Sequence, residues 1–333
     1  MQLETLIEEK KAVIGIIGLG YVGLPLLSTF FQKGFKVIGF DIDPYKIQCL
    51  KDAKSYINHI DPEIYTNLAN SNGDALFTNN FDQINSCDVI ILCVPTPLGS
   101  HNDPDLSFII ESMNSIVRNI KKNSLLILES TTYPGTMEEV LIPIVEKERK
   151  DLLIGENLFV GYSPEREDPG NKNFTTSNIP KVVGGLSKRC LGLCEMLYEK
   201  IISQVVPVSS LRTAEAVKIT ENIFRSVNIA LVNELKIIFD KMGINTNEVI
   251  DAASTKWNFS AFRPGLVGGH CIGIDPYYLT FKAQALGYQP EIILAGRRLN
   301  EFMPEYVASR FVKEMIKKGG ITSCAATESN LRL

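Results

Sequence analysis

Residues 12–41 read AVIGIIGLGYVGLPLLSTFFQKGFKVIGFD, and this stretch decides the fold. Two short runs of mostly β-branched residues, 13–17 and 37–40, flank an apolar helical stretch that Gly34 closes. A strand, a helix and a second strand in this order predict a βαβ unit with two parallel strands. The uncharged run 12–32 also has the hydropathy of a membrane span, but its glycines and Pro25 disfavour one continuous helix.

Three glycines of this unit, Gly18, Gly20 and Gly23, lie where the first predicted strand passes into the predicted helix. Asp41 follows the second strand, eighteen residues after the last glycine. In this context the spacing indicates a dinucleotide site, because the glycines permit a tight turn and the helix N-terminus faces the pyrophosphate. A glycine turn that serves packing alone is the alternative. The Asp41 carboxylate would bind ribose hydroxyls and repel a 2′-phosphate, which favours NAD over NADP.

The alternation of strands and helices continues to about residue 210 and then changes. Further strands are predicted at 88–94, 125–128, near 159, near 182 and at 205–208, with helices at 106–119 and 137–146. Residues 1–210 therefore predict an α/β domain, a Rossmann-like doubly wound parallel sheet that binds NAD. Residues 211–318 predict an all-helical central domain, with helices at 213–242, 247–254, 275–286 and 291–317. The tail 319–333 has no periodicity and predicts irregular structure.

Composition narrows the class of protein. A chain of 333 residues with 45% hydrophobic content can bury two cores, so disorder is excluded as its main state. The formal net charge of −4 and the absence of long like-charge runs argue against nucleic-acid binding. Seven irregularly spaced cysteines favour neither a disulfide framework nor a metal site, and the N-terminus does not resemble a secretory signal. We therefore expect a cytoplasmic protein with reduced thiols, no metal and no membrane association.

The helix predicted at 213–242 is apolar over most of its circumference. Its apolar residues are Ile219, Ile223, Phe224, Val227, Ile229, Leu231, Leu235 and Ile238. One small domain cannot easily cover such a surface, so we expect a second copy of the chain to cover the rest in a homodimer.

Polar residues on the same helix form one stripe. Lys218, Asn222 and Arg225 are spaced by four and three residues and therefore share a face. A buried ammonium without a partner is costly, so Lys218 is expected to face a polar cleft. An ordinary solvated face is the alternative.

A glycine-dense loop at 265–276, GLVGGHCIGIDP, places Cys271 just before a predicted helix. Exposed amides and the helix dipole favour the thiolate there, so Cys271 is a candidate nucleophile, and the glycines with Asp275 suggest backbone approach to a ligand. A buried, inert cysteine is the alternative. His270 adjoins Cys271 in sequence, but adjacent side chains usually diverge. Five further cysteines lie in apolar segments and are expected in the core, at positions 49, 87, 93, 190 and 194.

Two polar loops follow predicted strands. Residues 130–132, Ser-Thr-Thr, follow one strand, and residues 163–168, SPERED, follow another. Ligands of open α/β sheets bind outside the carboxyl ends of the strands, so both loops are candidate binding segments. Either could also be an ordinary surface loop.

Together these motifs resemble the UDP-sugar 6-dehydrogenases of the UDP-glucose/GDP-mannose dehydrogenase family. The resemblance covers about residues 11–318, through IGLGYVGLPL, CVPTP, ESTTYPGT, YSPEREDPGN, VPVSS, NIALVNELKIIFD, WNFSAFRPGLVGGHCIGIDPYYL and AGRRLNEFMPEYV. It implies oxidation of the C6 hydroxyl of a UDP-N-acetylhexosamine to the uronic acid with two NAD and one water, for capsule or O-antigen synthesis. UDP-N-acetylglucosamine and UDP-N-acetylmannosamine both remain open as substrates.

The resemblance also implies residue roles. Cys271 would form a thiohemiacetal and then a thioester, Lys218 and Asn222 would stabilise the oxyanion and orient water, and Arg263 would reach the substrate across the dimer. Glu165 would act as the base for thioester hydrolysis, aided by Asp275, with Thr131 near the water. Implied cofactor contacts are Gly18, Gly20, Tyr21, Val22, Gly23, Asp41, Pro95, Thr96 and Thr131. Implied substrate contacts are Glu165, Arg166, Lys218, Asn222, Arg263 and Gly268.

The resemblance stops near Lys318, where the family continues into a second Rossmann-like domain that binds the UDP moiety. The tail ITSCAATESNLRL does not match that domain, so we expect these residues to lack it, either as a fragment or through a disrupted gene. On that expectation the chain binds NAD but holds UDP-sugar weakly and turns over little. Two alternatives are a catalytically incomplete NAD-binding fragment and a single-step NAD-dependent hydroxyacid dehydrogenase, which needs no cysteine nucleophile.

Overall fold

The computed structural model describes residues 2–58, 60–166, 178–269 and 272–318. Two compact units make up the chain: the first runs up to Thr220 and includes Tyr277–Lys282, and the second comprises Glu221–Pro276 and the segment from Ala283 onward. Helices α8 (Leu211–Met242) and α10 (Asp275–Ala285) contribute residues to both units. The domain boundary between residues 210 and 211 stays a prediction.

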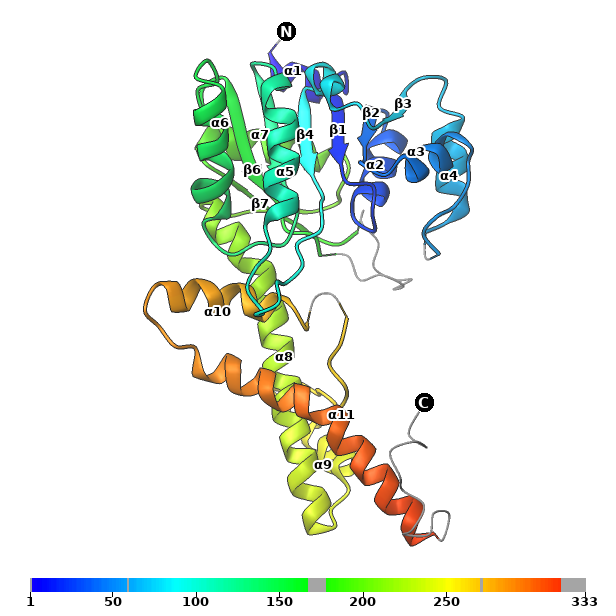
Figure 1. The fold of residues 1–333 in the computed structure, drawn as a ribbon, viewed down its shortest axis with the longest axis vertical. Coiled ribbons are helices and arrows are strands. Elements are labelled where there is room, and N and C mark those ends of the chain that lie inside the picture. The colour runs from blue at the N-terminus through cyan, green and yellow to red at the C-terminus, as the bar shows by residue number, and fades with distance from the viewer. Residues whose placement is uncertain (1, 59, 167–177, 270–271, 319–333) are drawn as a thin grey trace. The chain divides into compact units, whose positions relative to one another are not determined.

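The first unit is built on an eight-stranded sheet with the order β3-β2-β1-β4-β5-β6-β7-β8 (Figure 1). The strands are β1 Val13–Ile17, β2 Lys36–Phe40, β3 Ala75–Thr78, β4 Val89–Leu92, β5 Ser124–Leu128, β6 Leu158–Tyr162, β7 Lys181–Gly185 and β8 Val205–Pro207. Neighbouring strands are parallel except β6 and β7, which are antiparallel. Strands β4, β5 and β6 are buried along their whole length, as expected for a sheet covered on both faces. The predicted Rossmann-like fold is confirmed.

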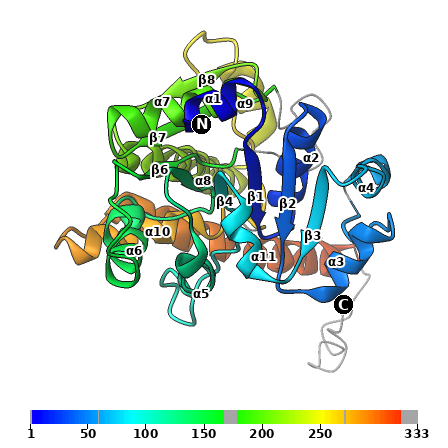
Figure 2. The same ribbon diagram turned by 90° about the horizontal axis from the view of Figure 1, so that it is seen from above.

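Helices cover both faces of this sheet (Figure 2). Buried residues of α1, α2 and α7 share one hydrophobic cluster with Val89 and Ile91 of β4, and those of α5 and α6 share another with Ile90 and Leu92. Alternate residues of one strand thus serve opposite layers. The helices are α1 Leu3–Glu8, α2 Gly23–Gln32, α3 Pro44–Lys51, α4 Pro62–Ala69, α5 Ser107–Ile116, α6 Ile142–Glu148 and α7 Lys188–Glu199, with short 3-10 turns at Phe81–Ser86 and Val117–Asn119.

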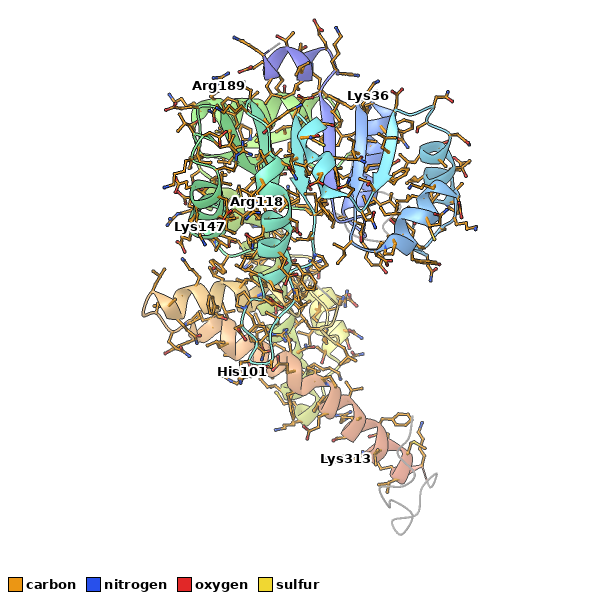
Figure 3. The ribbon with its side chains drawn as sticks, turned by 45° about the horizontal axis from the view of Figure 1, so that its top comes forward. Lys36, His101, Arg118, Lys147, Arg189 and Lys313 are labelled. Atoms are coloured by element: carbon orange, nitrogen blue, oxygen red, sulfur yellow. The ribbon has the colours of Figure 1, made fainter. Side chains whose placement is uncertain are left out.

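Basic side chains are spread over the first unit. Lys36 lies on β2, Arg118 follows α5, Lys147 lies on α6 and Arg189 lies on α7 (Figure 3). These four side chains therefore do not gather into one patch. No helix among the described residues is long and apolar enough to cross a membrane.

The helix predicted at 137–146 differs from the expectation. It begins as a π-helical turn, Met137–Leu141, and becomes α-helical only at Ile142. Pro143 has no amide hydrogen to donate to the preceding turn, which accounts for the change in helix type. Glu215 of α8 caps this helix, because its buried carboxylate accepts hydrogen bonds from the amides of Gly135 (2.5 Å) and Met137 (2.9 Å).

The second unit is helical. It contains most of α8 together with α9 (Thr246–Ala253) and α11 (Glu291–Lys317). Gly296 of α11 faces α8, since a Cβ there would lie in ordinary van der Waals contact, 3.5 Å, with the methyl of Ala230. A buried polar network joins the same helices: Asn233 donates to Asn300, which donates to the carbonyl of Ser226. These contacts pack α11 against α8.

Candidate functional site

The turn between β1 and α2 has the geometry of a dinucleotide site. Gly18 has a φ of +91°, and a Cβ on it would come within 2.7 Å of the Cys93 carbonyl oxygen. A Cβ on Gly23 would come within 1.9 Å of the Gly18 carbonyl oxygen, so both positions require glycine. A Cβ on Gly20 would instead meet open space among the described residues. The backbone at Gly20 is therefore open to a ligand.

The N-terminus of α2 suits a phosphate group. Within the described part of the chain no side chain caps this helix, and its first turn carries no acidic residue. The first amide groups of a helix carry partial positive charge and bind anions when they are not capped. The turn at Gly20 and this helix end together fit the pyrophosphate of NAD. Of the other predicted contacts here, Tyr21 is exposed and Val22 immediately precedes the helix.

Asp41 lies directly after β2 and is almost fully buried. Its carboxylate accepts hydrogen bonds from the amides of Leu19 (2.9 Å) and Asp43 (3.0 Å), which fix its orientation beside the glycine turn. It also forms an ion pair with Lys46 of α3, at 2.9 Å. Lys46 partly offsets the negative charge that would repel a 2′-phosphate. The contribution of Asp41 to cofactor choice therefore depends on Lys46.

The loops after β4 and β5 lie at the same edge of the sheet. Pro95 and Thr96 follow β4, and Thr131 follows β5 and is half-buried. Ser130 donates a hydrogen bond of 2.7 Å to the carbonyl of the residue before Pro95, which ties the two loops together. The hydroxyl of Tyr278 donates to the Thr96 carbonyl at 2.9 Å. These bonds hold the predicted cofactor contacts Pro95, Thr96 and Thr131 in a defined backbone arrangement.

Glu165, the predicted base, belongs to a buried charge network. Lys181, the first residue of β7, donates to Glu129 at 2.7 Å and to Glu165 at 3.2 Å. The hydroxyl of Tyr198 donates to the other carboxylate oxygen of Glu129. The amide of Arg166 donates to Glu165 at 2.8 Å, and the Arg166 guanidinium donates to a backbone carbonyl. All three charged side chains of the network are under one tenth exposed.

Burial and mutual attraction shift the protonation of this network in defined directions. Burial raises the pKa of Glu129, against the opposing influence of Lys181. Burial alone would lower the pKa of Lys181, but the carboxylates of Glu129 and Glu165 hold it above its ordinary value. Burial also raises the pKa of the nearby Cys93 thiol, so that group stays neutral. The two carboxylates therefore favour the charged form of Lys181 in this cluster.

The polar stripe of α8 meets the start of α10. Asn222 donates to the carboxylate of Asp275 at 2.5 Å, and its oxygen accepts a hydrogen bond from Arg225. Asn222 and Asp275 are both buried. Lys218 precedes Asn222 by one turn of α8, is half-buried, and has no carboxylate partner among the residues that the structure describes. The structure thus brings Asn222, Arg225 and Asp275 together, whereas the predicted polar cleft around Lys218 stays a prediction.

The loop before α10 is anchored at both sides of the predicted nucleophile. Asn233 of α8 donates to the carbonyl of Gly265 at 3.0 Å and accepts from its amide at 2.9 Å. Arg297 of α11 is buried and donates to the carbonyl of Ile272 at 3.5 Å. Gly268 is exposed. The candidates Cys271 and His270 lie outside the described residues.

Arg263 is exposed and bound within its own chain. Its guanidinium forms an ion pair with Asp251 of α9 and donates to the carbonyl of Asn247. The predicted contact to a substrate across the dimer stays a prediction. The five cysteines expected in the core are buried, which confirms that expectation.

Sequence reasoning missed several residues. Lys46 carried a signal, because it lies five positions after Asp41 on the helix that follows. Glu129 is the first residue of the motif ESTTYPGT, but nothing in that motif pointed to Lys181 or Tyr198. Lys181 and Tyr198 carried no signal, because residues far apart in the chain form their network. Asn233 lies within a motif that we had identified, but nothing in the motif pointed to Gly265.

Comparisons with known proteins agree with this geometry. The chain matches the UDP-glucose/GDP-mannose dehydrogenase family in its NAD binding domain over residues 12–202 and in its central domain over residues 212–302. Protein CapL from Staphylococcus aureus is 47% identical over 92% of this chain and 71% of its own length. UDP-N-acetyl-D-glucosamine 6-dehydrogenase from Pseudomonas aeruginosa is 47% identical over 93% of this chain and 72% of its own length. The solved structure of UDP-D-ManNAc dehydrogenase from Pyrococcus horikoshii has a TM-score of 0.84 at 33% identity, covering 92% of this chain and 72% of that one.

Proposed function

The chain belongs to the UDP-glucose/GDP-mannose dehydrogenase family, whose N-terminal domain binds NAD, and from this premise we propose that it oxidises the C6 hydroxyl of a UDP-N-acetylhexosamine to the uronic acid. The substrate class follows the relative named UDP-N-acetyl-D-glucosamine 6-dehydrogenase, and UDP-N-acetylmannosamine is the second candidate. The name CapL supports a role in making capsule polysaccharide, and O-antigen synthesis is the second candidate.

One observation carries the proposal of a two-step oxidation. Asn222 holds the buried carboxylate of Asp275 four positions after Cys271 in the chain. A single-step dehydrogenase has no hydrolytic step and needs no carboxylates to assist one. Asp275 and Glu165 are each buried, and a carboxylate of this kind can take a proton from water.

In the proposed reaction, NAD held at the glycine turn would accept one hydride in each oxidation, so NADH must leave and a second NAD bind between the two steps. The C6 hydroxyl loses a proton and a hydride to become an aldehyde, and Lys218 stabilises the negative charge that develops on oxygen. The Cys271 thiolate adds to the aldehyde carbon to give a thiohemiacetal, so the reactive aldehyde does not escape. Loss of a second hydride gives a thioester on Cys271.

Water then releases the product. Glu165 takes a proton from the water as it attacks the thioester carbonyl, Asn222 and Asp275 orient it, and the C–S bond breaks to return the Cys271 thiolate. In total, one alcohol, one water and two NAD⁺ are converted into one carboxylate, two NADH and three protons. We propose that Thr131 lies near the same water molecule.

We also propose that the active form is a homodimer. Phe224, Leu231 and Ile238 recur every seven residues along α8, and they are 57%, 53% and 44% exposed in the single chain. A heptad-spaced apolar stripe of this kind is typical of helix pairing. The opposite face of α8 is occupied within the chain, because Asn222, Ser226 and Asn233 are buried there, so the stripe is the available surface.

A covalent adduct tests the proposed function. The variant Glu165→Gln, incubated with NAD and UDP-N-acetylglucosamine or UDP-N-acetylmannosamine, should accumulate a uronyl thioester on Cys271, visible as a mass increase of the intact chain. Cys271→Ala should abolish the adduct, whereas Cys194→Ala, which removes a buried thiol of the core, should retain it. An adduct that survives Cys271→Ala, or none with either sugar, would contradict the proposal.

A further inference from the structure

The charge network around Lys181 contains more groups than the proposed reaction uses. It lies at one edge of the sheet: Glu129 directly follows β5, Glu165 follows β6, and Lys181 begins β7, whose antiparallel direction returns it to the carboxyl end of β6. Tyr198 approaches from α7 on one face of the sheet. Of these four residues, only Glu165 has a role in the proposed reaction.

The arrangement fixes the position of one ammonium group. Glu129 accepts hydrogen bonds on its two oxygens from different donors, Lys181 and Tyr198, and is therefore clamped. The Lys181 nitrogen also lies 5.4 Å from the centre of the Tyr198 ring, a cation–π contact. The Lys181 ammonium is thus held by Glu129 and by the Tyr198 ring. It also contacts the Glu165 carboxylate at 3.2 Å.

We infer that Lys181 is a positioning residue for Glu165, whose ammonium, clamped by Glu129 and Tyr198, orients the Glu165 carboxylate and keeps it ionised for hydrolysis. The role in hydrolysis rests on the proposed function, whereas the electrostatic relationship between Lys181 and Glu165 does not. An ionised carboxylate is what a base requires, and a buried one is costly unless a cation compensates it.

Because two carboxylates share one cation, the inference predicts two pKa shifts of opposite sign for Glu165. Glu129 competes with Glu165 for the same ammonium and repels it by like charge, so removal of the Glu129 charge should favour the ionised form of Glu165. Removal of the Lys181 charge should do the reverse. Among the described residues, the other titratable groups beside the network are Tyr198 and the Cys93 thiol, whose pKa values are raised by burial, and Arg166, whose amide donates to Glu165 and whose guanidinium donates to the carbonyl of Pro180. Arg166 is unchanged in both variants. A purely structural role for Lys181 would not produce shifts of opposite sign.

The test is a direct titration of Glu165 in the chain labelled with [δ-¹³C]glutamate, with the resonance assigned by its loss in Glu165→Gln. In Lys181→Met the midpoint for Glu165 should rise by at least about one pH unit, and in Glu129→Gln it should fall. The matched control is Lys121→Met, which breaks the ion pair of Lys121 with Asp88 at the opposite edge of the sheet. It should leave the midpoint unchanged. Unaltered NAD affinity reports that each variant is folded.

Every result of this titration decides the inference. Shifts of opposite sign in the two variants support it, and an unmoved midpoint, or movement in the same direction in both, overturns it. If Lys181→Met does not fold, Glu129→Gln, which keeps the size and an acceptor oxygen, decides alone: a lower midpoint supports the inference and an equal or higher one overturns it. If Cys271 forms no adduct with UDP-sugar, the proposed function fails, while the titration still reports on Lys181 and Glu165.

Discussion

The amide of Asn222 on α8 donates a hydrogen bond to the carboxylate of Asp275, the first residue of α10, although the two are 53 positions apart in the chain. The same asparagine accepts a hydrogen bond from Arg225, so its amide group cannot rotate without losing both partners. Asp275 is 2% exposed and depends on such donors. This contact connects the long helix to the segment that follows the predicted nucleophile.

Asn222→Ala should therefore remove a donor from a buried carboxylate. We expect a loss of about 1–3 kcal/mol in the free energy of unfolding, measured by urea denaturation, together with loss of uronate formation. Asn228→Ala is the control, because Asn228 lies on the same helix and its one side-chain hydrogen bond to a described residue goes to the Phe224 carbonyl of that helix. Equal stability of the two variants would show that the Asn222–Asp275 contact contributes little.

The Asp41–Lys46 ion pair predicts how cofactor preference can be altered. The wild-type chain should bind NAD more tightly than NADP in calorimetric titrations. Asp41→Asn leaves Lys46 free to meet a 2′-phosphate, so NADP affinity should rise by about tenfold, the size of one charge-assisted hydrogen bond. Asp41→Asn combined with Lys46→Met should lose that gain. Comparable binding of NAD and NADP by the wild type would contradict the assigned role of Asp41.

Glu215 should give the stability of the chain a pH dependence. Burial raises its pKa from 4.5 to about 7, while the amides of Gly135 and Met137 oppose the shift. Between these values the folded chain keeps a proton that the unfolded chain releases, so the free energy of unfolding falls as pH rises, by about 3 kcal/mol in all. Glu215→Gln should remove this slope and Glu234→Gln, an exposed change on the same helix, should not. A slope unaffected by Glu215→Gln would refute the assignment.

The exposed stripe on α8 predicts a dimer. Sedimentation at micromolar concentration should give a dimer for the wild type and a monomer for Leu231→Asp, because a buried charge at a helix interface has no partner. Leu153→Asp places the same charge on an equally exposed leucine of the first unit and should leave the dimer intact. A monomeric wild type would contradict the proposal.

Local patterns in the sequence predicted much of the fold. Helix α11 has the predicted bounds, Glu291–Lys317, and the glycine turn at Gly18 has the backbone that its spacing indicated. Helices α3 and α4 were missed although each begins with an Asp-Pro pair, in which the aspartate caps the helix and the proline starts it. The Asp-Pro pair is a local signal in the sequence and could have predicted both helices.

The network of Lys181 could not be predicted in the same way. A lysine before an apolar strand is ordinarily a surface residue. It is buried here because β7 pairs antiparallel to β6 and returns Lys181 to the edge where Glu129 and Glu165 lie. Apolar periodicity predicts that a strand exists but not the direction in which it pairs. The pairing of Asn222 with Asp275 depends likewise on contacts between distant segments.

The most direct test of the central claim is the ratio of NADH formed to uronate formed when concentrated protein acts on saturating UDP-N-acetylglucosamine or UDP-N-acetylmannosamine with excess NAD. The account predicts two NADH for each uronate, with neither product formed by Cys271→Ala. One NADH for each molecule of a carbonyl product, or a uronate yield that does not depend on Cys271, would contradict it.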